Sequence, residues 1–260
     1  MWSKNKPLLG AKQNWKHPLS IGLVAHYLFN EGGGNTAINL IDKKLNGTLV
    51  NNPSWATGKF GKAISFNGTS QYAASTWGLL GSGMSRTVTF WFKTNTLGLA
   101  GNNPIVSTGN ILSENSPLWL IVQRPTTNVL SVDHGGAYRD GTTVLATNKW
   151  YFGAYTFNSS GNAFTLYLNS NVESSGTSVD SGVNTNLYIG EGYPGYFSGS
   201  IDDVRIYNRA LSASEVKQLY TNPFADVRPS RNSWSLSNLL GGTPFSPRAP
   251  YMTGVLSIKA

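Results

Sequence analysis

The glutamates of this sequence are scattered along the chain, which argues against a hydrolytic site of the glycosidase type. Such a site needs two carboxylates about 5 to 10 Å apart, one on each side of the bond that is cleaved. The glutamates are Glu31, Glu114, Glu173, Glu191 and Glu215. No short stretch holds two of them, and no G-x-S-x-G nucleophile motif occurs. The chain has no cysteine, which excludes thiolate catalysis and cysteine-bound zinc. Its three histidines lack the spacing of metal ligands.

Two loops carry side chains that could contact a ligand. The stretch GEGYPG at 190–195 has the spacing G-x-G-x-x-G, but strand-like sequence follows it, so we interpret it as a turn and not as a dinucleotide site. Tyr193 and Tyr196 in this loop offer aromatic faces on which a sugar ring could stack, although aromatic residues at sheet edges also serve packing. In HGGAYRD at 134–140, Tyr138, Arg139 and Asp140 form a second candidate contact patch, with an ordinary solvated turn as the alternative.

These loops are expected to be positioned by β-strands. Alternation of apolar and polar residues marks many short segments, and in RTVTFWFKT at 86–94 it places Val88, Phe90 and Phe92 on one face. Turn residues separate the segments, and only one helix is expected, late in the chain. About a dozen such strands without intervening helices predict an all-β fold, an antiparallel two-sheet sandwich.

The expected helix covers residues 212–220. Ser212 and Glu215 form an S-x-x-E capping box, in which each side chain satisfies a free backbone N–H of the first helical turn. Val216 and Leu219 give the helix an apolar stripe, and Asn222-Pro223 ends it. We therefore predict that this helix closes the fold.

Charge divides the chain into a neutral body and two basic ends. The net charge is +8, of which residues 20–221 contribute +1, residues 1–19 contribute +4 and residues 222–260 contribute +3. We expect a domain at 20–221 that folds alone, flanked by extended arms at 1–19 and 222–260. The arms mix apolar and basic residues, so we expect residues 1–19 and 223–260 to contact other protein chains, either copies of this chain or a capsid-like shell. Charge this sparse does not favour nucleic acid, and no run of about 18 apolar residues predicts membrane insertion.

Several blocks resemble the laminin-G-like, concanavalin A-like jelly-roll family. The stretches are LVAHYLFNEGGGNTAINL, NGTLVNNPSWATGKFGKAISFNGTSQYA, NKWYFGAYTFNSSGNAFTLYLN and GSIDDVRIYNRALSASEVKQLY. They occur in the family's order and cover roughly residues 20–221. The resemblance implies a jelly roll whose last strand returns to the sandwich before the short helix. The segment after Phe224 is similar to endings of laminin-G-like proteins of tailed phages.

The resemblance also implies a structural calcium ion between the first turn and the last strand. Carried over residue by residue, it points to Glu31, Asn39 and Asp202 as ligands. Asn39 stands where the family more often has Asp, and calcium requires six to eight oxygens. The alternative is that Asp202 accepts local backbone N–H groups and binds no ion.

Three functions follow as hypotheses, the first two without catalysis. The first is a virion-surface protein, a capsid decoration or fibre-like module anchored by its arms. The alternative is a carbohydrate-binding module of an extracellular or cell-surface protein, for which we note that no signal peptide is evident. A glycoside hydrolase is a distant third, because the Glu-x-Asp-x-x-Glu string of the family's glucanases is missing.

Overall fold

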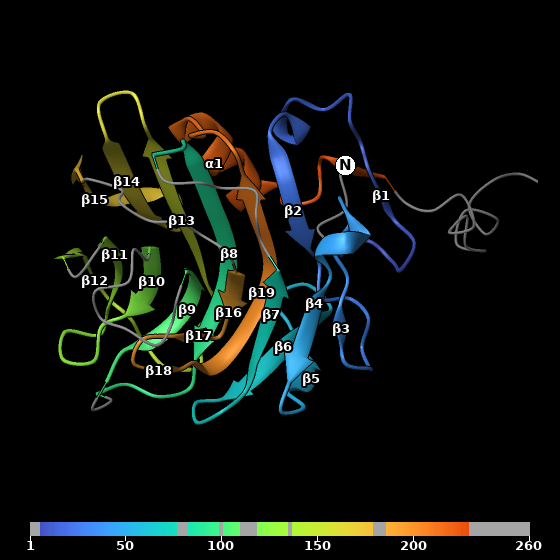
Figure 1. Ribbon diagram of the computed structural model, residues 1–260, viewed down its shortest axis with the longest axis horizontal. Helices are drawn as coiled ribbons and strands as arrows, with labels where there is room; N and C mark the ends of the chain where they lie inside the picture. The colour runs from blue at the N-terminus through green and yellow to red at the C-terminus, as the bar shows by residue number, and fades with distance from the viewer. Residues whose placement is uncertain are drawn as a thin grey trace, which may run out of the picture.

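Two antiparallel sheets packed face to face form the body of the protein (Figure 1). The computed structural model describes residues 6–76, 83–98, 101–109, 119–134, 137–178 and 186–228. Within these ranges each sheet has eight strands. The first sheet has the order β12 (Ala137–Val144), β11 (Val129–His134), β10 (Trp119–Gln123), β9 (Asn103–Thr108), β16 (Asn186–Ile189), β7 (Tyr72–Thr76), β4 (Gly47–Val50) and β3 (Thr36–Ala37). The second has the order β15 (Asn171–Thr177), β14 (Ala163–Leu168), β13 (Tyr151–Asn158), β8 (Arg86–Thr94), β19 (Ser198–Tyr207), β6 (Lys62–Asn67) and β5 (Ser54–Thr57), and β2 (Leu23–Tyr27) also pairs with β19.

Short elements complete the described part of the chain. Two further pairs of strands are β1 (Lys12–Gln13) with β20 (Val227–Arg228), and β17 (Glu191–Gly192) with β18 (Gly195–Tyr196). The helical elements are η1 (Pro18–Ser20), η2 (Lys43–Leu45) and α1 (Ala213–Thr221). No helix in the described ranges is long and apolar enough to cross a membrane. The predicted all-β antiparallel jelly-roll sandwich with one short α-helix is confirmed.

The alternating pattern of β8 explains how both of its faces become buried. Val88, Phe90 and Phe92 lie in the core between the two sheets, as their spacing predicts. Trp91 points to the opposite face, yet it is also buried, because α1 covers that face. Tyr220 of the helix stacks on Trp91 with 5.6 Å between the ring centroids.

Helix α1 has the cap that the sequence predicts, and its bounds differ from the expected 212–220 by one residue at each end. Ser212 is its N-cap, and both hydrogen bonds of the capping box with Glu215 are present. Val216 and Leu219 are buried against the outer face of the second sheet. The helix therefore closes the fold, and the prediction is confirmed.

Both ends of the described chain pack against the sandwich, which differs from the extended arms expected at 1–19 and 222–260. Residues 6–20, which we call the N-terminal segment, include the buried Ala11 and Leu19. At the other end Phe224 is buried, and its ring lies 5.3 Å from that of Phe60. Strands β1 and β20 join the two ends as an antiparallel pair. The packed unit thus extends beyond 20–221, and residues 1–5 and 229–260 lie outside the described residues.

Candidate functional site

The GEGYPG stretch forms a hairpin that lies on the outer face of the first sheet. Its two strands are β17 and β18. A Cβ atom at Gly192 would lie 2.5 Å from Leu120 and 2.9 Å from Pro104, so glycine is needed for the hairpin to approach β9 and β10. Gly195 adopts φ +143°, which other residues rarely adopt. The motif is a turn, as predicted, and it carries Tyr193, half-buried, beside the cis Tyr193–Pro194 peptide bond.

Three tyrosines gather beside this hairpin around one glutamate. The ring of Tyr72 lies 6.1 Å from those of both Tyr188 and Tyr196. Tyr72 on β7 and Tyr188 on β16 alternate with buried residues, so their side chains face away from the core. We call Tyr72, Tyr188, Glu191 and Tyr196 the tyrosine–glutamate site.

Glu191 is the chemically unusual member of this site. Its residue is only 5% exposed, and its Oε2 atom has no hydrogen-bond partner among the described residues. Burial raises the pKa of its carboxyl to about 7, and a hydrogen bond with Tyr196 opposes that rise. The Oε2 atom is itself buried, so this carboxylate is an unsatisfied acceptor behind the aromatic rings, which a ligand's hydroxyl group could reach once a ring shifts.

A second polar cluster lies next to the same hairpin. The guanidinium carbon of Arg124 lies 3.8 Å from the centroid of the Tyr138 ring, and Arg124 forms an ion pair of 3.4 Å with Asp140. Asn102 donates a hydrogen bond of 2.5 Å to the Tyr138 hydroxyl and accepts one of 3.3 Å from Arg124. We call Asn102, Arg124, Tyr138 and Asp140 the arginine patch. It adjoins the hairpin, since a Cβ atom at Gly195 would lie 2.9 Å from the Asn102 carbonyl oxygen.

The structure thus brings together most of the ligand contacts expected from the sequence. Tyr193 and Tyr196 share the hairpin, and Tyr138 and Asp140 lie beside it in the arginine patch. Arg139 lies between Tyr138 and Asp140 on β12, so its side chain leaves from the opposite face of the strand. The sequence did not single out Tyr72, Tyr188, Glu191, Asn102 and Arg124 as contacts. The alternation of residue types in the sequence predicts that Tyr72 and Tyr188 point outward. It does not predict the strand order that brings them together.

The three calcium ligands that the resemblance implies engage in separate contacts. Glu31 Oε1 accepts the Ile38 N–H at 2.6 Å, and Asn39 Oδ1 accepts the His26 N–H at 3.1 Å. Asp202 forms an ion pair with Lys6. Among the described residues, no three acidic, histidine or cysteine side chains gather closely enough to hold a metal ion. The Lys6 ammonium group stands beside Asp202, where the resemblance implies a calcium ion, and calcium binding stays a prediction.

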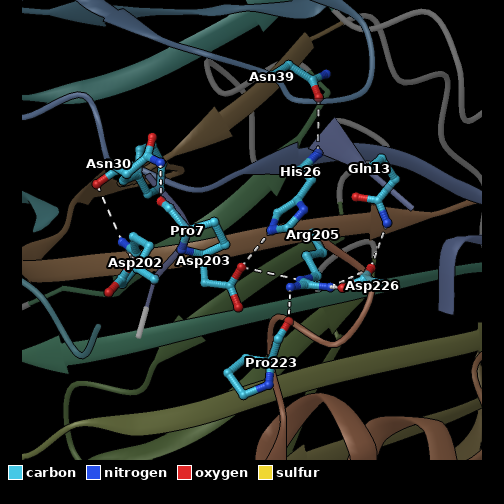
Figure 2. Close-up of polar contacts among 12 residues, drawn as sticks. Pro7, Gln13, His26, Asn30, Asn39, Asp202, Asp203, Arg205, Pro223 and Asp226 are labelled. Atoms are coloured by element: carbon cyan, nitrogen blue, oxygen red, sulfur yellow. Dashed lines mark hydrogen bonds and ion pairs between the residues drawn. The ribbon is translucent and has the colours of Figure 1, made fainter. Parts of the chain in front are cut away.

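A buried ionic network lies next to Asp202 (Figure 2). Arg205 donates to both carboxylate oxygens of Asp226, at 2.8 and 2.9 Å, and also to the carbonyl oxygen of Pro223. It lies 3.3 Å from Asp203, which in turn contacts His26 Nε2 at 2.7 Å. We call this group, together with Gln13, the ionic network.

The His26–Asp203 pair has the geometry of a catalytic dyad but no access to a substrate. Both residues are almost fully buried. Burial and the nearby Arg205 charge lower the pKa of His26, so the imidazole is neutral at physiological pH. The pair therefore has a structural role.

A separate pocket of about 540 Å³ lies between the N-terminal segment and the residues around β3 and η2. Its wall is mainly apolar and includes Leu8, Leu9, Trp15 and Ile38. Trp15 is 61% exposed and belongs to neither the tyrosine–glutamate site nor the arginine patch. The pocket therefore provides an aromatic position for comparison with those two sites.

Comparison with known proteins finds one matching family model and several structures with a similar fold. A family model described as the concanavalin A-like lectin/glucanases superfamily matches residues 67–217, more than half of the chain. Domain 4 of AbnA, a GH43 extracellular arabinanase from Geobacillus stearothermophilus solved in complex with arabinotriose, is similar with a TM-score of 0.60 and 24% identity. That match covers 81% of this chain and 98% of the arabinanase domain. No curated protein matches the sequence.

Two larger proteins contain a similar fold. The binding domain of Paraclostridial Mosquitocidal Protein 1 matches with a TM-score of 0.60 and 19% identity, over 80% of this chain and 53% of that one. A Trypanosoma rangeli sialidase matches with a TM-score of 0.61 and 16% identity, over 78% of this chain and 33% of the sialidase. The chain thus spans about half of the first and a third of the second. At these identities the likeness concerns the fold alone, and the virion-surface role and location stay hypotheses.

Proposed function

Because the chain belongs to the concanavalin A-like lectin/glucanase superfamily, we propose that it binds carbohydrate without cleaving it. The tyrosine–glutamate site is the binding surface, extended by the arginine patch. The observation that carries this proposal is the position of Glu191, whose buried Oε2 atom lacks a hydrogen-bond partner among the described residues, among three tyrosine rings.

The chemistry of a sugar matches the groups at this surface. A pyranose or furanose ring has apolar C–H faces, which pack on the aromatic faces of Tyr72 and Tyr196. Its hydroxyl groups can accept from Arg124 or Asn102, and a shift of a tyrosine ring would uncover Glu191 Oε2 as an acceptor for them. A few convergent polar groups on an aromatic surface are typical of specific small-molecule sites. The arabinotriose complex of the similar arabinanase domain supports an oligosaccharide as the ligand class.

The same site favours binding over hydrolysis. A glycosidase requires a second carboxylate opposite the first. In the described residues the hydrogen-bonding group that acts on Glu191 is the tyrosine Tyr196, and no second carboxylate acts on its pKa. This favours binding over cleavage at Glu191.

The proposal can be tested by affinity electrophoresis against a panel of soluble polysaccharides that includes arabinan, followed by titration calorimetry with oligosaccharides of any polymer that retards the chain. Tyr196→Ala and Glu191→Gln should each weaken binding at least about tenfold, which corresponds to 1.4 kcal/mol. Trp15→Ala is the matched control, because it removes an exposed aromatic ring at the separate pocket. Equal binding by wild type and both site variants, or loss of binding in Trp15→Ala alone, would refute this assignment.

A further inference from the structure

Strand β19 changes its neighbour at Asp202 and Asp203, and this change opens a gap in the second sheet. Ile201 pairs with Ile64 of β6, whereas Val204 pairs with Tyr27 of β2 on the same side. Neither strand continues the ladder across the two aspartates, and the β8 side also has a register shift there. Backbone oxygens at the gap therefore need partners other than a neighbouring strand.

The side chain of Lys6 fills this gap. Its Nζ atom contacts Asp202 Oδ1 and the carbonyl oxygen of Lys62, and it lies 3.4 Å from the carbonyl oxygen of Phe29. The Lys6 side chain is 4% exposed and that of Asp202 is 0% exposed. An ammonium group can donate three hydrogen bonds, and here oxygens from three separate segments of the chain accept them.

The surroundings of Lys6 are those of a cation site. Carboxylate and carbonyl oxygens that converge on one point are what a hard divalent cation prefers. Glu31 lies close enough for the Lys6 charge to lower the pKa of its carboxyl, against the larger effect of burial, which raises it. The turn at Gly58 closes the site, because a Cβ atom there would lie 2.6 Å from both Asp202 Oδ2 and the Lys62 carbonyl oxygen.

We propose that the Lys6 ammonium takes the place of a divalent cation in this fold, so that the chain carries its own cation and needs no metal ion beside Asp202. Lys6 also fixes the N-terminal segment to β19, a strand almost 200 residues further along the chain. Removal of the Lys6 side chain should therefore do two things. It should loosen the N-terminal segment, and it should leave an oxygen-lined site that a calcium ion can enter.

The test compares melting temperatures of the full chain in EDTA and in calcium chloride, with terbium luminescence as a direct measure of ion binding. Wild type should melt at the same temperature in both and show no bound terbium. Lys6→Ala should melt lower in EDTA, recover part of the loss in calcium and bind one terbium ion per chain, because an ion that binds the native state stabilises it by mass action. Lys6→Met, which keeps the apolar stem, serves if Lys6→Ala does not fold.

Two controls separate a cation site from a general charge effect. Lys12→Ala removes an exposed lysine from the same N-terminal segment and should leave both readouts as in wild type. Adding Asp202→Asn to Lys6→Ala should abolish the calcium response. The proposal is overturned if wild type binds the ion or depends on it. It is also overturned if the Lys6 variants are destabilised but do not respond to calcium, since Lys6 would then form an ordinary ion pair. The same holds if the Lys6 variants are as stable as wild type, since the ion pair would then not stabilise the fold.

Discussion

Replacing Asp226 by alanine should destabilise the protein by about 3 kcal/mol, because it leaves the buried Arg205 charge without its main partner. Removal of one member of a buried ion pair costs about 3–5 kcal/mol. Arg205 has 1% of its side chain exposed and donates to both oxygens of Asp226. Asp203 stays within 3.3 Å of the guanidinium, which places the expected loss at the lower end of that range.

Urea unfolding followed by tryptophan fluorescence would measure this loss, and a thermal melt would check it. For a domain of this size, 3 kcal/mol corresponds to a melting temperature about 6–12 °C lower. Arg228→Ala is the matched control, because Arg228 is exposed two residues further along and its removal should change stability by less than about 0.5 kcal/mol. Because a chain cut to residues 20–221 lacks Asp226, it should also be less stable than a chain cut to residues 6–228. If Asp226→Ala unfolds at the same urea concentration as Arg228→Ala, the ionic network does not hold the C-terminal end to the sandwich.

Three further predictions concern the helix, the candidate site and the response to acid. Ser212→Ala should lower the free energy of unfolding by about 1 kcal/mol, because the helix loses its cap. Leu219→Ala should lower it by about 2–5 kcal/mol, because the substitution leaves a cavity. Unchanged urea midpoints in both variants would show that α1 does not close the fold. Carbohydrate affinity should rise as pH increases through about 7, because Glu191 loses its proton there and becomes a stronger acceptor. Calorimetry with Glu191→Gln should show no such pH dependence. If the variant has the same pH profile as wild type, another group causes the effect. Burial and the Arg205 charge lower the pKa of His26, so below about pH 6.5 the unfolded chain binds a proton that the folded chain does not. Stability should therefore decrease as pH falls from about 6.5, less steeply in His26→Gln, and parallel curves for the two chains would contradict this.

The sandwich and its helix were predictable because each depends on local sequence patterns. Alternation in β8 defines which side chains enter the core, and the capping box at Ser212 marks where α1 begins. The packing of both chain ends was not predictable in this way. Strands β1 and β20 have two residues each, too few for a periodic pattern, and Lys6 meets Asp202 only through the three-dimensional fold.

The candidate site was predictable in part for the same physical reason. Tyr193 and Tyr196 are neighbours in sequence, so the loop that carries them was evident. Glu191 looked like one of several scattered glutamates, because burial is what changes its pKa, and burial depends on the hairpin's position against the sheet. Tyr72 joins the site through the pairing of β7 with β16, which are separated by more than 100 residues.

The position of β19 in the chain has a consequence for synthesis on the ribosome. This strand pairs with β8 on one side and with β6 and β2 on the other, and it is among the last to be made. Until it emerges, the strands that flank it have unpaired edges where β19 will later pair, and such edges favour association between nascent chains. Contacts of this sequence separation also slow folding, to the range of milliseconds to seconds for β-rich domains. We therefore expect the second sheet to assemble late, after residue 207 has left the exit tunnel, and the N-terminal segment to wait for its anchor until then.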